Sequence, residues 1–292
     1  MKVIETVAEM QTVRQAASGS LGLVPTMGFL HEGHLSLVRR ARQDNDTLAV
    51  SIFVNPTQFA PNEDLDRYPR DMGRDLALLA DEQVDVVFAP DADQMYPEGF
   101  DDWIEPPAPL ATRLEGASRP GFFRGVCTVV ARLFRIIQPD SAYFGQKDAQ
   151  QLRVIRQMVL DLHLPVEIVP MPIVRESDGL AMSSRNAYLS PEERQRALAL
   201  STALAEARQM VRDGATDAEQ LRTHVRSVID AAGGIEIDYV SVADEEGLEE
   251  LNAIERPAIA LLAARIGHTR LIDNTILVPP GIPVPAALAD LL

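Results

Sequence analysis

The chain has 292 residues, of which 46% are hydrophobic and 24% charged, and this composition excludes both a disordered chain and a miniprotein that depends on disulfides. Domains of about 100–200 residues are usual, so we expect two. The 27 basic and 43 acidic residues give a net charge of −16 at pH 7, which argues against a nucleic-acid partner because phosphate backbones bind basic surfaces.

Cysteine usage and apolar runs predict the compartment. Cys127 is the single cysteine and cannot form an intramolecular disulfide, and residues 1–15 lack the apolar core of a secretory signal. No apolar run approaches the roughly 18–20 residues that span a bilayer. We therefore expect a cytoplasmic protein with no membrane segment. The apolar surroundings of Cys127 favour a packing role over a catalytic one.

The first two-thirds of the chain alternate between short β-branched runs and amphipathic stretches, the pattern of successive βαβ units. Apolar residues recur with the helical period over 126–137 and 152–162. The fold class predicted for residues 1–180 is α/β, with a doubly wound, Rossmann-like parallel sheet. Its predicted strands are Leu21–Pro25, Thr47–Val54, Val84–Phe88, Ser141–Phe144 and Val166–Val169.

The pattern changes after residue 180. Ser190 followed by Pro191 reads as a helix N-cap with proline at the first helical position. Two helices, at 191–213 and 217–232, then precede three strands instead of alternating with them. Residues 181–292 are therefore expected to form a smaller C-terminal α+β domain, with strands at 235–242, 258–266 and 269–278.

The first candidate site is Pro25-Thr-Met-Gly-Phe-Leu-His-Glu-Gly-His34, where the first of these strands passes into a helix. Phosphates bind at such junctions, because free N–H groups of the helix face the ligand. His31 and His34 could donate to phosphate oxygens, and the flanking Gly28 and Gly33 allow close backbone approach. A pair of metal ligands or capping histidines is the alternative.

Three more polar segments are candidates. Asn55 and Gln58 follow the second strand and could hydrogen-bond hydroxyl or carboxylate groups, although Asn-Pro is also a common turn. Lys147 follows the strand at 141–144 and offers a cation to phosphate, or is simply solvated. Residues 180–186 contain two serines and Arg185, which could clamp a triphosphate or form a plain linker.

Taken together, the motifs resemble those of the pantothenate synthetase family, within the nucleotidylyltransferase superfamily. The resemblance runs from about residue 23 to residue 191, more than half of the chain. The motifs occur in the family's order: Pro-Thr-Met-Gly with His-x-Gly-His, Phe-Val-Asn-Pro-x-Gln-Phe, Leu-Glu-Gly-x-x-Arg-Pro-Gly, Tyr-Phe-Gly-x-Lys-Asp-x-Gln-Gln and Met-Ser-Ser-Arg-Asn.

The resemblance implies an enzyme that condenses pantoate with β-alanine, using ATP and Mg²⁺, through a bound pantoyl adenylate, with release of AMP and pyrophosphate. It also implies a homodimer. Because water must be kept from the bound intermediate, we expect the C-terminal domain to close over the site as a lid. His34, as proton donor, would act with His31, Lys147 and Arg185. The implied ATP site comprises Met27, Gly28, Phe29, Leu30, His31, Glu32, Gly33, His34, Gly145, Gln146, Lys147, Asp148, Val174, Met182, Ser183, Ser184 and Arg185.

The remaining implied roles concern the other substrates and the metal. Gln58 and Gln151 would hold pantoate, with Gln58 also reaching β-alanine and Asn55 as a further substrate contact. Asp75 is a candidate magnesium ligand, with a solvated helix carboxylate as the alternative. Two positions depart from the family pattern, Phe122 where histidine is frequent and Gln146 where glutamate is frequent.

Three other functions share parts of this pattern. A nucleotidylyltransferase that stops at the adenylated product would use the same histidine and phosphate sites. An aminoacyl-tRNA synthetase also adenylates a carboxylate, but the acidic composition disfavours a tRNA partner. A non-catalytic nucleotide sensor would not need the paired carboxamides at Asn55 and Gln58.

Overall fold

The computed structural model describes residues 1–61, 63–289 and 291. The chain forms two compact units. The first consists of Met1–Gly145 and Gln150–Met171, and the second of Gln146–Ala149 together with the residues from Pro172 onward. The first unit ends at residue 171, whereas the sequence predicts a domain boundary at 180/181. In addition, the short turn at 146–149 belongs to the second unit.

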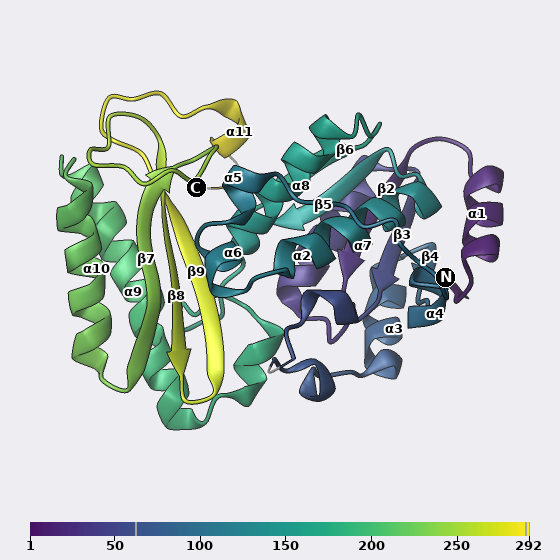
Figure 1. Ribbon diagram of the computed structural model, residues 1–292, viewed down its shortest axis with the longest axis horizontal. Helices are drawn as coiled ribbons and strands as arrows, with labels where there is room; N and C mark the ends of the chain where they lie inside the picture. The colour runs from purple at the N-terminus through teal and green to yellow at the C-terminus, as the bar shows by residue number, and fades with distance from the viewer. Residues whose placement is uncertain (62, 290, 292) are drawn as a thin grey trace. The chain divides into compact units, whose positions relative to one another are not determined.

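Among the described residues, the first unit contains a parallel sheet of six strands in the order β1-β4-β3-β2-β5-β6 (Figure 1). The order runs outward from β2 through β3 and β4 on one side and through β5 and β6 on the other, which confirms the predicted doubly wound class. The strands are β1 Lys2–Ile4, β2 Leu21–Thr26, β3 Thr47–Ile52, β4 Val86–Phe88, β5 Ser141–Gly145 and β6 Glu167–Met171.

Helices surround this sheet and bury its central strands. Leu37, Val38 and Ala41 of α2, with Leu79 of α3, pack onto β2, β3 and β4 in one apolar cluster. This burial of parallel strands explains why their sequences are nearly continuous apolar runs. The helices of residues 1–161 are α1 Val7–Ala16, α2 Glu32–Asp44, α3 Met72–Asp81, α4 Ala92–Met95, α5 Ala108–Ala111, α6 Glu115–Ser118, α7 Phe122–Ile137 and α8 Ala149–Asp161, with 3₁₀ turns η1 Pro56–Gln58, η2 Leu65–Arg67 and η3 Gln146–Asp148.

Each strand predicted for the first unit differs from the observed strand by one or two residues at one end or both, and the sequence prediction does not include β1. Val84 lies outside β4, because its N–H is donated to the carbonyl of Leu79 at the end of α3. β6 continues through Pro170, which is tolerated because β6 is an edge strand. β1 is a three-residue edge strand that pairs with β4, too short to produce a recognisable alternation.

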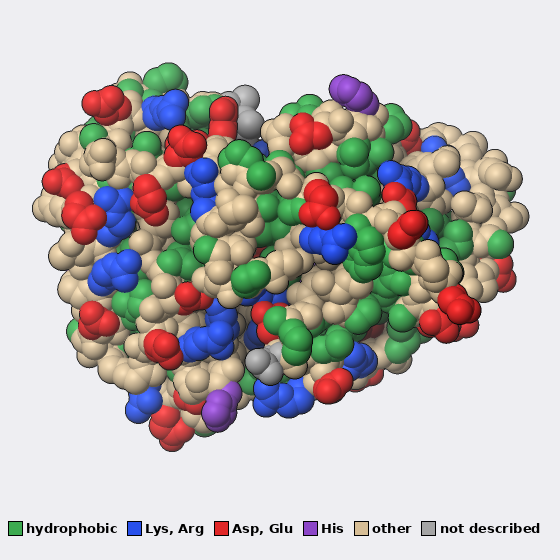
Figure 2. Space-filling view, viewed as in Figure 1, with side chains coloured by type: hydrophobic (Ala, Val, Ile, Leu, Met, Phe, Trp, Pro, Cys, Tyr) green, Lys and Arg blue, Asp and Glu red, His purple; other side chains and the backbone are tan. Residues whose placement is uncertain are grey.

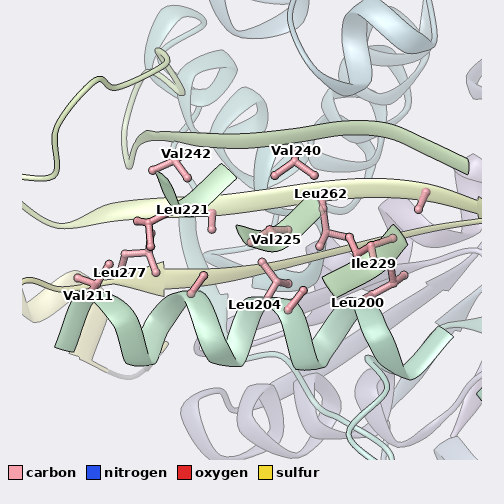
Figure 3. Packing of buried hydrophobic residues seen from close by; sticks show 14 of the residues in the cluster. Leu200, Leu204, Val211, Leu221, Val225, Ile229, Val240, Val242, Leu262 and Leu277 are labelled. Carbon is pink, nitrogen blue, oxygen red and sulfur yellow. The ribbon is translucent and has the colours of Figure 1, made fainter. Parts of the chain in front are cut away.

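The second unit contains an antiparallel sheet of three described strands, β7 Ile235–Asp244, β8 Ala258–Ile266 and β9 Thr269–Leu277. α9 Pro191–Arg212 and α10 Ala218–Ala232 pack against it and form the apolar core drawn in Figure 3. Ser190 caps α9 through a reciprocal pair with Glu193, as the Ser-Pro sequence indicated. The predicted α+β organisation is confirmed, and η4 Ser184–Tyr188 and α11 Ala286–Ala289 complete the unit.

Cys127 is fully buried in α7, and burial raises the pKa of its thiol to about 12. The thiol therefore stays neutral near pH 7 and acts as a core side chain, as predicted. Figure 2 shows acidic and basic side chains interspersed over one face of the molecule. None of the described helices is long and apolar enough to cross a membrane.

Candidate active site

The segment Met27–His34 leaves the carboxyl end of β2, next to β5 in the sheet. The strand order reverses between these two strands, and ligands of open α/β sheets bind outside the carboxyl ends of the strands at such a point. α2 begins at Glu32 with His31 as its N-cap, so the first amides of that helix lie in the same segment. The topology thus puts the predicted phosphate loop at the expected position.

Thr26 and Asp75 anchor this loop. The Thr26 hydroxyl donates to the carbonyl of Ser51 (2.8 Å) and accepts from the Gly28 amide (3.1 Å). Each carboxylate oxygen of Asp75 accepts one loop amide, from Phe29 at 2.7 Å and from Leu30 at 2.8 Å. The anchors hold Phe29 in the left-handed region, at φ 49°. These hydrogen bonds therefore define the shape of the loop.

Asp75 is only 1% exposed, which rules out the solvated helix carboxylate considered above. Its two oxygens already accept amide hydrogens, and no group of three or more His, Cys, Asp or Glu side chains suited to a metal occurs within the described residues. These contacts make Asp75 a support that shapes the loop before His31. Its role as a magnesium ligand stays a prediction.

The two histidines lie together. Their ring centroids are 4.1 Å apart with a 33° angle between the planes. The backbone N–H of His31 donates to Nδ1 of His34 at 3.3 Å. Because Nδ1 acts as the acceptor, the neutral ring carries its proton on Nε2, which makes Nε2 a donor. This arrangement suits His34 to donate a hydrogen bond from Nε2 to a ligand oxygen.

Asn55 and Gln58 form a second polar group beside the loop. Asn55 is 1% exposed, and its Nδ2 donates both to Oε1 of Gln58 (3.1 Å) and to the carbonyl of Gly125 (3.2 Å). Its Oδ1 accepts from Thr57 and from the Tyr96 hydroxyl (2.7 Å). With every polar atom engaged inside the protein, Asn55 positions η1 and is not disposed to contact a substrate directly.

Gln58 is oriented by Asn55. Since its Oε1 accepts from Asn55, Nε2 is the donor end of the carboxamide, and it lies 2.9 Å from Sδ of Met27. A thioether is a weak acceptor, so these hydrogens could pass to a stronger one. The contact brings the second predicted site against the first. A half-buried donor next to the phosphate loop suits a carboxylate or hydroxyl ligand.

The amino-terminal end of α7 packs against η1. A Cβ on Gly125 would lie 2.3 Å from the carbonyl oxygen of Thr57, so only glycine permits this approach. Arg119 donates to the carbonyl of Gln58 (3.2 Å) and pairs with Glu63. Its guanidinium lies 3.7 Å from the ring centroid of Phe122. Phe122, where the family frequently has histidine, therefore packs against Arg119, which in turn supports the backbone of Gln58.

The paired glutamines of α8 have different environments. Gln150 is buried and holds the segment before α7, donating to the carbonyls of Leu110 (2.6 Å) and Arg113 (2.8 Å) and accepting from the Glu115 amide (2.9 Å). Gln151 is half-buried on the first turn of the same helix. Of the pair, only Gln151 has the exposure that a ligand contact requires.

In the second unit, Val174 lies beside the Met182–Arg185 segment. The Met182 amide donates to the carbonyl of Val174 at 3.0 Å, next to a bridge between Arg175 and Ala181. Ser183 caps η4 by accepting from the Arg185 amide. These predicted ATP contacts are therefore neighbours on one short hairpin. Within the same unit, Lys147 lies in η3 with Nζ 3.5 Å from Oδ1 of Asp148.

Sequence reasoning missed Asp273 and Asn274, adjacent in β9. Asp273 pairs with Arg175 through both oxygens (2.7 and 3.0 Å), and Asn274 donates to the carbonyls of Gln146 and Lys147. The available signal was an acidic and an amide residue between the apolar pairs Leu271–Ile272 and Ile276–Leu277 of one predicted strand, because buried polar groups need partners.

Comparison with known proteins gives a consistent result. The family model described as pantoate-beta-alanine ligase matches residues 2–276. A pantothenate synthetase of Roseiflexus sp. (strain RS-1) is 61% identical over 277 residues, covering 95% of this chain and 99% of that protein. One from Thermotoga petrophila is 55% identical over 280 residues, covering 95% of this chain and 100% of the relative.

Solved structures agree. The crystal structure of pantothenate synthetase from Thermus thermophilus has a TM-score of 0.92 and 47% identity, covering 96% of this chain and 100% of that one. A pantoate-beta-alanine ligase from Francisella tularensis, described as complexed with beta-gamma ATP and beta-alanine, has a TM-score of 0.79 and 36% identity, with coverages of 94% and 97%. With the Rossmann-like sheet and the anchored histidine loop, these matches establish that the chain belongs to the pantoate–β-alanine ligase family.

Proposed function

We propose that this chain is an ATP-dependent ligase that joins pantoate to β-alanine through a bound pantoyl adenylate, releasing AMP and pyrophosphate. The observation that carries the proposal is the contact of the Gln58 carboxamide with Met27, since it sets a donor for pantoate directly beside the histidine loop. Family membership supports the same substrates.

In the first proposed step, a carboxylate oxygen of pantoate attacks the α-phosphorus of ATP and pyrophosphate leaves. No protein nucleophile is needed, so the protein acts by positioning and by neutralising charge. Nε2 of His34, with His31 beside it, donates to the phosphate oxygens, and Lys147 and Arg185 supply positive charge. Mg²⁺ would enter bound to the phosphates of ATP.

In the second proposed step, the amine of β-alanine attacks the carbonyl of the mixed anhydride, AMP leaves, and the nitrogen loses a proton. Gln58 and Gln151 keep the pantoyl group in place between the two steps. Because water would hydrolyse the anhydride, we propose that the C-terminal domain acts as a lid during this interval. We also propose that the enzyme works as a cytoplasmic homodimer, as expected from the sequence.

The proposed chemistry is tested by product analysis. With pantoate, β-alanine, ATP and Mg²⁺, the expected products are pantothenate, AMP and pyrophosphate in equal amounts, measured by chromatography. Formation of ADP would indicate an acyl phosphate and contradict the proposed intermediate. AMP that stays attached to the product would instead indicate a nucleotidylyltransferase.

Substitution of Gln58 should separate the substrates. In Gln58→Ala, we expect the KM for pantoate to rise about 10–100-fold, the usual effect of losing a hydrogen bond to a charged group. The KM for ATP should change less than about threefold, because the His31–His34 pair is intact. Steady-state kinetics with each substrate varied in turn measures both constants.

Gln157→Ala provides a matched control for this variant, since Gln157 lies on the outer part of α8 and hydrogen-bonds to Asp161 of the same helix. Its constants should match those of the unmodified enzyme. An equal rise of both KM values in Gln58→Ala would remove Gln58 from the pantoate site.

A further inference from the structure

Asn274 lies within β9 with a side chain that is only 2% exposed. Its Nδ2 donates to two consecutive carbonyls, those of Gln146 (2.9 Å) and Lys147 (3.0 Å). Its Oδ1 accepts from Nε2 of Gln146 at 3.3 Å. Both donors and the acceptor of this carboxamide are therefore used on one three-residue turn, η3.

The turn that Asn274 holds carries Lys147. A 3₁₀ turn of three residues has few hydrogen bonds of its own, so its backbone depends on outside partners. The Lys147 side chain is itself long and flexible, with 21% of its surface exposed. The bonds from Asn274 to the carbonyls of Gln146 and Lys147 fix the backbone from which this flexible cation extends.

Asp273, the preceding residue, gives β9 a second polar support. Its carboxylate pairs with Arg175 and also accepts from the Asn274 amide at 2.7 Å. Arg175 follows Val174 and bridges to Ala181, which precedes Met182. Neighbouring residues of one strand thus support both ATP-binding segments proposed in this unit, and strands hold functional groups more rigidly than loops do.

We propose that Asn274 is a positioning residue for Lys147, holding η3 so that the ammonium group meets the phosphates of ATP during adenylate formation. The inference rests on the proposed function. Asn274 itself contacts no substrate in this account and acts only through the turn.

Asn274→Asp tests the inference, because it keeps the shape but replaces the donor with an oxygen that faces two carbonyls. Pantoate-dependent exchange of labelled pyrophosphate into ATP should fall about 10–100-fold, the scale expected when a reacting group is displaced by about 1 Å. The KM for pantoate should stay within about twofold. In a Lys147→Ala background the same substitution should cost less than about threefold, since coupled residues are not additive.

Two more variants separate a loss of the donor from a general effect of changing β9. Asn274→Ser keeps one donor and should lose less activity than Asn274→Asp, while Thr275→Ala, the next residue of β9, is the matched control and should behave as wild type. An equal loss with and without Lys147, or an unchanged rate, would overturn the inference. Unfolding of both Asn274 variants would also overturn it, because Asn274 would then serve the whole unit. Absence of exchange in the wild-type enzyme would instead reject the proposed function.

Discussion

His34→Ala is expected to lower turnover by about 10²–10³-fold, the usual cost of removing a donor that stabilises charge in the transition state. The expectation rests on Nδ1 of His34, which accepts from the His31 amide and so leaves Nε2 as the donating nitrogen. His34→Gln, whose amide can donate from nearly the same position, should recover part of the loss. Initial rates at saturating substrates measure both effects.

The fold should survive the change at His34, so the melting temperature is measured on the same samples. The matched control is His268→Ala, in the exposed turn between β8 and β9, which should keep full turnover. Turnover of His34→Ala close to that of the unmodified enzyme would exclude His34 from the reaction.

Asp75→Ala is expected to have the largest effect on stability. It leaves the amides of Phe29 and Leu30 without their acceptors, and a buried donor that loses its partner costs about 1–3 kcal/mol, so the free energy of unfolding should fall by roughly 2–6 kcal/mol. Total stabilities are about 5–15 kcal/mol, so this loss is large. Urea unfolding measures it, and the KM for ATP should rise with the loosened histidine loop.

Asp75→Asn should lower the stability nearly as much, because an NH2 group replaces one carboxylate oxygen and then faces a backbone N–H, which is also a donor. Asp81→Ala, at the exposed end of the same helix, is the control and should change stability by less than about 0.5 kcal/mol. An Asp75 variant with normal stability but a raised requirement for Mg²⁺ would contradict the structural role and support Asp75 as a magnesium ligand.

The fold was largely predictable because its determinants are local. The β-branched runs, the helical stripe of α7 and the Ser190–Glu193 capping box each act over a few residues. The prediction differs from the structure where a contact with a distant residue decides the conformation, or where a strand is very short. The sequence predicts Val84 in a strand, but its N–H donates to the carbonyl of Leu79 in α3. The strand β1 depends on its pairing with the distant β4.

The sequence suggests which polar side chains could contact ligands, and those assignments stay predictions, but it does not reveal the residues that support them. The contacts of Asp75 with the histidine loop join residues about 45 positions apart, and those of Asn274 with η3 join residues 127 and 128 apart. No local pattern encodes such distances. The same holds for Asn55, because its polar partners Gly125 and Tyr96 become its neighbours only in the folded chain.

The central claim, an adenylate formed before the amine reacts, is tested most directly by isotope exchange. With pantoate, Mg²⁺ and ATP but no β-alanine, the enzyme should exchange labelled pyrophosphate into ATP, and AMP should accumulate only to about the enzyme concentration, because the bound adenylate is protected from water. Addition of β-alanine should then release AMP catalytically. Exchange that strictly requires β-alanine would contradict the two-step account.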